Sequence, residues 1–171
     1  MRIKFLLVLA IAIFTFPLIT FSQESAGWTK WDKLLGDWVG EGSGKPGQGD
    51  GTFTFKTDLD NKILIRKGHT RFPATDKNPA STHDDLMIIS LDSKNIPSKA
   101  VYFDNEGHTI NYNITYAGDT IVLTSEKINN FPVFRLNYLL LDNETVNIKF
   151  EISRDGVNFM TYIEGKSKKT K

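Results

Sequence analysis

The chain has 171 residues, of which 21 are Lys or Arg and 20 are Asp or Glu, giving a formal net charge of +1. A nucleic-acid-binding protein would carry a basic stripe, whereas the basic run of this chain is its C-terminal tail at 166–171. The chain has no cysteine, which excludes disulfides and a lipid-modified cysteine, so a secreted protein of this kind must be stabilised by its own core.

Residues 1–22 have the layout of a secretory signal peptide. Arg2 and Lys4 give a positive start, residues 5–19 are almost wholly apolar, and the small residue Ser22 favours cleavage directly after it. The apolar run is shorter than the about 20 residues that span a bilayer, which argues against the alternative of an uncleaved anchor. We therefore expect a secreted or periplasmic protein with no stable membrane insertion after cleavage.

Residues 23–171 are long enough for one domain with an ordinary core. Apolar residues at helical spacing over 28–35 predict a short helical turn that closes one end of the domain. A strand pattern follows in which Gly40, Gly42 and Gly44 occupy alternate positions, so one face of the strand carries no side chains. Glycine at such positions marks a tight bend or the close approach of another backbone or a ligand.

From residue 52 onward, short strand patterns alternate with turns, and no helix pattern intervenes. Asp60 and Asn61 are expected to form a two-residue hairpin turn because both tolerate positive φ. About ten strands at regular spacing predict an all-β fold, an antiparallel up-and-down β-barrel. After the first strand, the expected strands span 52–59, 62–72, 83–92, 99–104, 108–116, 120–125, 133–141, 145–153 and 159–168.

Strict alternation over 108–116 and 145–153 indicates strands with one buried and one wet face. The apolar residues of the buried faces either line a ligand space or fill a packed core, and the pattern leaves both alternatives open. The residues expected to face inward are Phe53, Phe55, Ile63, Ile65, Met87, Ile89, Tyr112, Phe134, Leu136, Tyr138, Phe150 and Ile163.

Two segments carry a resemblance to a known family. Residues 34–44 (LLGDWVGEGSG) resemble the first strand of nitrobindin-like haem-binding β-barrels, a calycin-type family related in shape to lipocalins and fatty-acid-binding proteins. Residues 72–79 (FPATDKNP), followed by His83, are similar to a proline-containing loop that in that family precedes a His-Xaa-Glu-type segment. The resemblance implies a calycin-type barrel over most of residues 23–171.

The chain departs from this family at the haem ligand. Nitrobindin-like proteins ligate haem through a histidine on the last strand, but 159–168 contains none, and Glu164 or its neighbours would take that place. Carboxylate is a poor axial ligand for ferrous haem compared with imidazole. By analogy with fatty-acid carriers, an inward arginine would meet a ligand carboxylate. Arg66 and Arg71 lie on opposite faces of one strand, so one of them must face inward.

The candidates for metal binding are weak. His83 and Asp85 point the same way on one strand, and His69 and His108 could complete a cluster, but the spacing matches no zinc signature. His108 follows a turn, which favours a rim histidine bonded to a loop over a ligand contact in the mouth.

No catalytic residue is predicted. The chain lacks a nucleophile elbow, and Asp84 and Asp85 point to opposite faces of a strand, so they cannot flank one bond. Enzymatic activity therefore has no residues to support it.

We therefore expect a protein that binds a small hydrophobic or amphipathic molecule in the barrel, without a cofactor and without nucleic acid. One alternative is a haem protein that uses His83 or His108 and acts on nitrogen oxides or peroxynitrite. Another is a ligand-free interaction module whose loop at 45–51 and barrel rim contact a partner. The residues expected to contact the ligand are Trp38, Met87, His108, Tyr112 and Tyr138.

Overall fold

A computed structural model describes residues 27–41 and 49–170. The predicted signal peptide, Gly42, Gly44 and most of the loop at 45–51 lie outside these residues. No helix among the described residues is long and apolar enough to cross a membrane.

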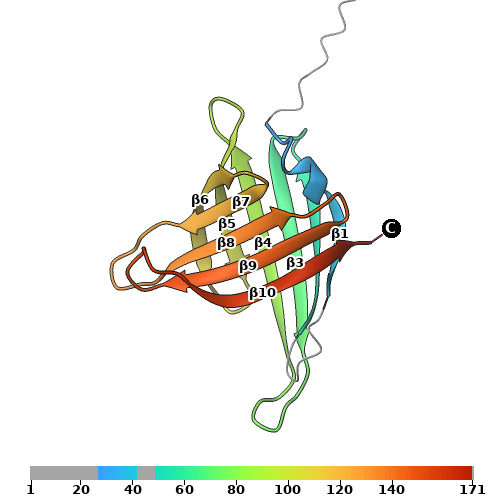
Figure 1. Cartoon of the computed structure of the whole chain (residues 1–171), viewed down its shortest axis with the longest axis vertical. Coiled ribbons are helices and arrows are strands. Elements are labelled where there is room, and N and C mark those ends of the chain that lie inside the picture. Colours follow the sequence, from blue (N-terminus) through green and yellow to red (C-terminus); the bar gives the residue numbers. More distant parts are fainter. Residues whose placement is uncertain (1–26, 42–48, 171) are drawn as a thin grey trace, which may run out of the picture.

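The predicted all-β barrel is confirmed. Ten described strands close into one antiparallel barrel, in which each strand pairs with its neighbours in sequence and the last pairs with the first (Figure 1). The helical turn is a single 3-10 turn, η1 (Asp32–Leu34). The strands are β1 (Gly36–Glu41), β2 (Asp50–Asp58), β3 (Ile63–Phe72), β4 (Ser81–Leu91), β5 (Pro97–Asp104), β6 (Thr109–Ala117), β7 (Thr120–Ser125), β8 (Val133–Leu140), β9 (Thr145–Ser153) and β10 (Met160–Lys169).

The turn between β2 and β3 is longer than the predicted pair Asp60 and Asn61. Leu59, Asp60 and Asn61 all have positive φ (49°, 53° and 61°), and the Lys62 N–H donates to the Asp58 carbonyl at 3.1 Å. A two-residue hairpin needs only two such residues, so Leu59 is forced into the left-handed region as well.

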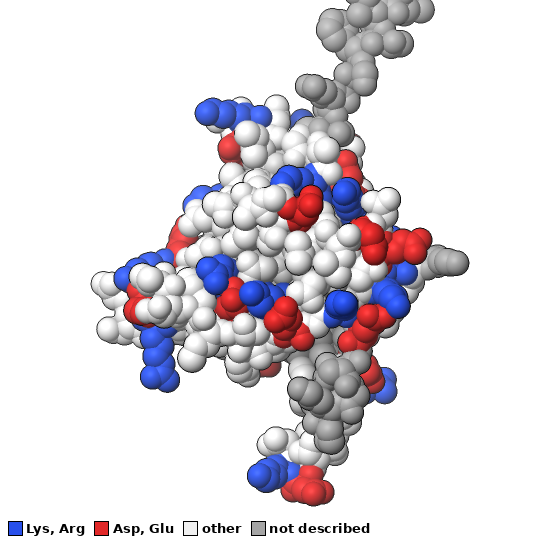
Figure 2. Space-filling view, in the orientation of Figure 1, with Lys and Arg blue, Asp and Glu red and all other residues white. Residues whose placement is uncertain are grey.

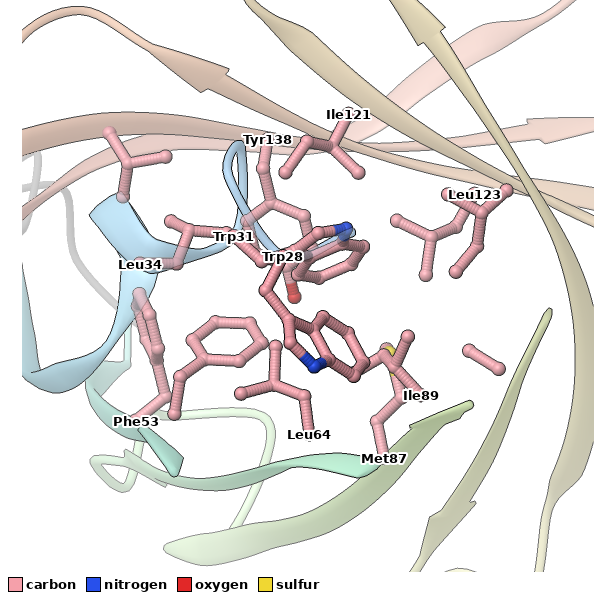
Figure 3. Close-up of a cluster of buried hydrophobic side chains, with 14 of the residues drawn as sticks. Trp28, Trp31, Leu34, Phe53, Leu64, Met87, Ile89, Ile121, Leu123 and Tyr138 are labelled. Carbon is pink, nitrogen blue, oxygen red and sulfur yellow. The ribbon is translucent and has the colours of Figure 1, made fainter. Parts of the chain in front are cut away.

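One end of the barrel, the closed end, is filled by the segment around η1. Trp31 is fully buried, with its ring 6.1 Å from that of Phe55 and 6.5 Å from that of Tyr138. Trp38 Nε1 donates to the Leu34 carbonyl at 2.7 Å, which fixes the angle at which β1 leaves the turn. Figure 3 shows Trp28, Trp31 and Tyr138 gathered with Leu64, Met87 and Ile89 in this core. This end is therefore a packed core.

The inward face of β3 differs from the prediction. Leu64 is fully buried and Arg66 faces the same side, whereas Ile63 and Ile65 point outward. The run Ile63-Leu64-Ile65 is apolar throughout, so the sequence could not choose between its two faces. The choice is made by the pairing of β3 with β4, which sets Leu64 against buried Ile89.

Candidate functional site

A buried ion pair lies inside the barrel wall formed by β3 and β4. Arg66 Nη1 donates to Asp85 Oδ1, and only 14% and 8% of the two side chains are exposed. Gly68 pairs directly with Asp85, and a Cβ at Gly68 would overlap the Asp85 carboxylate. The Arg66 guanidinium also lies 5.0 Å over the Phe53 ring. A glycine and an aromatic face thus shape the space that holds the pair.

Three tyrosines surround this ion pair, Tyr102 on β5, Tyr112 on β6 and Tyr138 on β8. Burial, reinforced by the negative charge of Asp85, raises the pKa of Tyr102 and that of Tyr112. Burial also raises the pKa of Tyr138 to about 12, although the positive charge of Arg66 opposes the shift. All three phenols are therefore hydrogen-bond donors at neutral pH.

Two donors in this cluster lack a partner. Arg66 Nε and the Tyr138 hydroxyl are buried, and neither makes a hydrogen bond within the described part of the chain. Figure 3 shows the Tyr138 hydroxyl pointing toward the middle of the barrel. A buried polar group without a partner costs about 1–3 kcal/mol, so such groups mark positions where an acceptor would be stabilised.

An alkaline titration followed by phenolate absorbance should show the buried tyrosines. Tyr138 ionises near pH 12 in the folded chain but near about 10 in the unfolded chain. Because folding raises the pKa of Tyr138, ionisation of this phenol favours the unfolded chain. The free energy of unfolding therefore keeps its full value below the pKa of Tyr138 in the unfolded chain, and it falls as the pH rises through this window. Replacing Tyr138 with Phe should remove absorbance only from the late phase that accompanies unfolding. A loss of absorbance from the early phase would contradict the burial of this phenol.

A chain of hydrogen bonds joins the cluster to the barrel rim. His83 Nε2 lies 2.9 Å from the Tyr102 hydroxyl, and His83 Nδ1 lies 3.1 Å from Glu106 Oε1. Glu106 belongs to the exposed β5–β6 turn, and the Tyr102 phenol is held near Asp85. Both ring nitrogens of His83 are thus engaged.

The weak metal-binding candidates are not brought together in the described part of the chain. Strand alternation places His69 outside the barrel, where Nδ1 lies 2.6 Å from Asp84 Oδ1. His108 is bonded to Asp104 at 2.8 Å in the β5–β6 turn, the rim position that its place after a turn favoured. No group of three His, Cys, Asp or Glu side chains in the described ranges could hold a metal ion. As predicted, Asp84 and Asp85 point to opposite faces.

The expected ligand contacts separate into three places. Tyr112 and Tyr138 come together near Asp85, and Met87 pairs with Arg66 on the adjacent strand. Trp38 lies in the packed core at the closed end, where it stacks 5.8 Å from the Phe53 ring. His108 is exposed at the rim and faces solvent. The structure therefore gathers three of the five contacts around the ion pair.

Sequence reasoning missed Asp85 and Tyr102 as members of this site. A signal was present, because an inward arginine on one strand requires an acid at an inward position of a neighbouring strand. Once Leu64 is taken as the buried residue of β3, Arg66 faces inward and Asp85 is the matching acid.

The inward-facing residues toward the other end of the barrel are only half buried. This open end is bounded by the β3–β4, β5–β6, β7–β8 and β9–β10 connections. The face of β10 toward the interior carries Gly165, where an added Cβ would meet no atom within 4 Å. The half-buried apolar residues that face this region are Ile110, Phe134, Leu136, Ile148 and Phe150. The structure therefore leaves open space beside Gly165, and the apolar residues that face this region keep part of their surface exposed.

Of the residues expected at the place of the family's haem ligand, Glu164 itself points out of the barrel. The register pairs Glu164 with Lys149, so its side chain points outward, where Asn147 Nδ2 donates to Glu164 Oε1 at 2.9 Å. The inward residue at this point of β10 is Gly165, which offers no ligand atom. The residues present at this wall therefore do not fit an axial haem ligand.

The sequence matches no protein-family model and no curated protein. Among solved structures, the chain is similar to the crystal structure of Rv2717c from M. tuberculosis, with a TM-score of 0.55 and 13% sequence identity. The match covers 84% of this chain and 97% of that chain. At this identity the likeness shows a shared fold, so this chain is an antiparallel β-barrel protein with the same architecture as Rv2717c.

Proposed function

We propose that this protein is a secreted or periplasmic calycin-type barrel that binds a small amphipathic molecule in its open half. The observation that carries the proposal is the pair of buried donors without partners, Arg66 Nε and the Tyr138 hydroxyl. The apolar tail of the ligand would lie against the half-buried side chains Phe134, Leu136 and Phe150. No enzymatic step is included in the proposal.

The charge of the cluster selects the ligand head. Arg66 is already neutralised by Asp85, so a second full negative charge would lack compensation in this buried place. Arg66 Nε can only donate and the Tyr138 hydroxyl can donate as well as accept, so donation is the capacity that the two vacant groups share. An uncharged acceptor oxygen, such as that of a ketone, ester or protonated carboxyl group, matches both conditions.

Haem is not favoured by the residues present. His83 is the inward-facing histidine of the described chain, and both of its ring nitrogens are engaged by Tyr102 and Glu106. His108 would have to break its bond to Asp104 at the rim. An absorption scan of the mature protein, supplied with haem and then separated from unbound haem, should show no Soret band, and a Soret band would overturn the proposal in favour of the haem alternative.

The test compares two probes on delipidated protein, a long-chain methyl ketone and the hydrocarbon of the same length. Tyr138→Phe removes one donor and keeps the ring, so it should weaken ketone binding about tenfold, the equivalent of one hydrogen bond of about 1.4 kcal/mol. Hydrocarbon binding should not change, which makes it the matched control. Equal losses for both probes would contradict the head-group assignment.

Native mass spectrometry of protein from its own compartment identifies the natural occupant. A co-purifying mass of lipid size supports the proposal. Delipidated wild-type protein that binds neither probe would overturn it and leave the ligand-free interaction module.

A further inference from the structure

The open end of the barrel carries an unusual concentration of exposed apolar side chains. Seven large hydrophobic residues of the described chain are more than half exposed, and six of them belong to the β7–β8 loop or to the segment from the β9–β10 loop into β10. These six, here called the apolar rim, are Ile128 (59%), Phe131 (66%), Val157 (77%), Met160 (68%), Tyr162 (69%) and Ile163 (55%). The seventh, Leu59, lies in the β2–β3 turn at the closed end.

We propose that the apolar rim docks the protein on an anionic lipid surface. The two loops are neighbours, because a hollow of about 600 Å³ is lined by residues 127–132 of one loop together with Ile152 near the end of β9 and Arg154 at the start of the other loop. In Figure 1 they project together from the left side of the barrel. They therefore form one surface that can meet a membrane at once.

The exposure of the rim is built into the loop structure. Asp155 Oδ1 accepts hydrogen bonds from the N–H groups of Val157 and Asn158 at 2.8 and 2.7 Å and from the Ser153 hydroxyl at 2.8 Å. These bonds lower the pKa of Asp155 and fix the turn that holds Val157 outward. The Phe131 N–H likewise donates to the Ile128 carbonyl at 3.1 Å, which fixes a turn at the other loop tip.

The charge around the rim favours lipid headgroups over a protein partner. Lys127 and Arg154 line the same hollow as Ile128 and Phe131, and Figure 2 shows this projection as mostly uncharged, with both basic and acidic groups on it. The neighbouring acidic side chains are engaged, because Glu126 pairs with Lys99 at 3.2 Å and Asp155 is bonded within its own turn. Ile128 and Phe131 project from one loop with the polar Asn129 and Asn130 between them, and Val157 projects from the other, so these side chains form no flat packed face of the kind that a protein interface needs. Apolar tips flanked by cations insert into the interface of an anionic bilayer.

The rim is continuous with the barrel interior. Tyr162 contacts Phe150 with ring centroids 6.2 Å apart, and Phe150 stacks on Phe134 at 5.8 Å. Aromatic residues such as Phe131 and Tyr162 favour the boundary between lipid and water. Docking would therefore bring the open end of the barrel against the membrane, and an apolar molecule could then pass from the lipid into the barrel. This last step rests on the proposed function, whereas the docking itself does not.

The test is co-sedimentation of the mature chain with two kinds of vesicle, phosphatidylcholine alone and phosphatidylcholine with phosphatidylserine. We expect binding to the anionic vesicles, weakened at least tenfold in the double variant Phe131→Ser/Val157→Ser. The double variant Lys127→Gln/Arg154→Gln should lose the preference for phosphatidylserine. Leu59→Ser removes an equally exposed apolar side chain at the closed end, and it should bind as the wild type does.

Three results would overturn the proposal. The first is that the wild type binds neither kind of vesicle, and the second is that Leu59→Ser weakens vesicle binding as much as the rim variant does. The third is a dimer in solution that the Phe131→Ser/Val157→Ser variant converts to monomer, which would make the rim a contact between two copies. Because the substituted side chains are exposed, thermal unfolding of the variants should match the wild type. Probe binding without vesicles, measured as above, reports the proposed function separately from docking.

Discussion

Replacing Asp85 with alanine should lower the free energy of unfolding by about 3–5 kcal/mol, because the buried guanidinium of Arg66 would lose its charge partner. Both side chains are shielded from solvent, so water cannot replace the carboxylate without opening the barrel wall. Arg66 Nε already has no hydrogen-bond partner, and in the variant Arg66 Nη1 would lose its acceptor as well. Urea denaturation followed by tryptophan fluorescence measures the loss.

The matched control is the double variant Arg66→Met/Asp85→Leu, which removes both charges and keeps comparable volumes. It should recover most of the stability lost by the single substitution, since a buried pair replaced by apolar residues is often neutral. A double-mutant cycle with the two single variants then gives the coupling energy. A loss below about 1 kcal/mol in Asp85→Ala would show that the pair behaves like an exposed one.

Replacing Trp31 with alanine should cost about 3–5 kcal/mol, the usual range for truncating a large buried aromatic side chain. Trp31 is fully buried, contacts the rings of Phe55 and Tyr138, and donates through Nε1 to the Tyr116 hydroxyl at 3.0 Å. The cavity would lie at the closed end, where η1 and β1 are anchored. Chemical denaturation of both proteins, compared by midpoint and slope, measures the change.

Tyr116→Phe serves as the control for the Trp31 experiment. It removes the hydroxyl that accepts from Trp31 and donates to the Pro97 carbonyl at 3.0 Å, but it leaves the packing of both rings. A loss of about 1 kcal/mol per hydrogen bond is expected. If Tyr116→Phe cost as much as Trp31→Ala, hydrogen bonding rather than packing would hold the closed end together.

The fold was predictable where local patterns are unambiguous. The alternation over 145–153 has a period of two, and β9 spans the same residues. Turn residues such as Gly118, with a φ of 57°, punctuate the chain between strands. Short turns leave each strand no neighbour other than the next in sequence, so the up-and-down order follows from spacing alone. The exact strand ends were not predictable, because alternation gives no signal for where a strand stops. For example, β4 spans Ser81–Leu91 where 83–92 was expected.

The sequence by itself determined that the chain is an antiparallel barrel with aromatic residues inside, because side-chain alternation and turn chemistry are local properties. The tertiary structure alone decided which face of β3 is inward, and so whether Arg66 or Arg71 enters the barrel. Arg66 and Asp85 are 19 residues apart, and only the register of β3 on β4 brings them together. Registers are set by pairing across strands, which no single strand encodes.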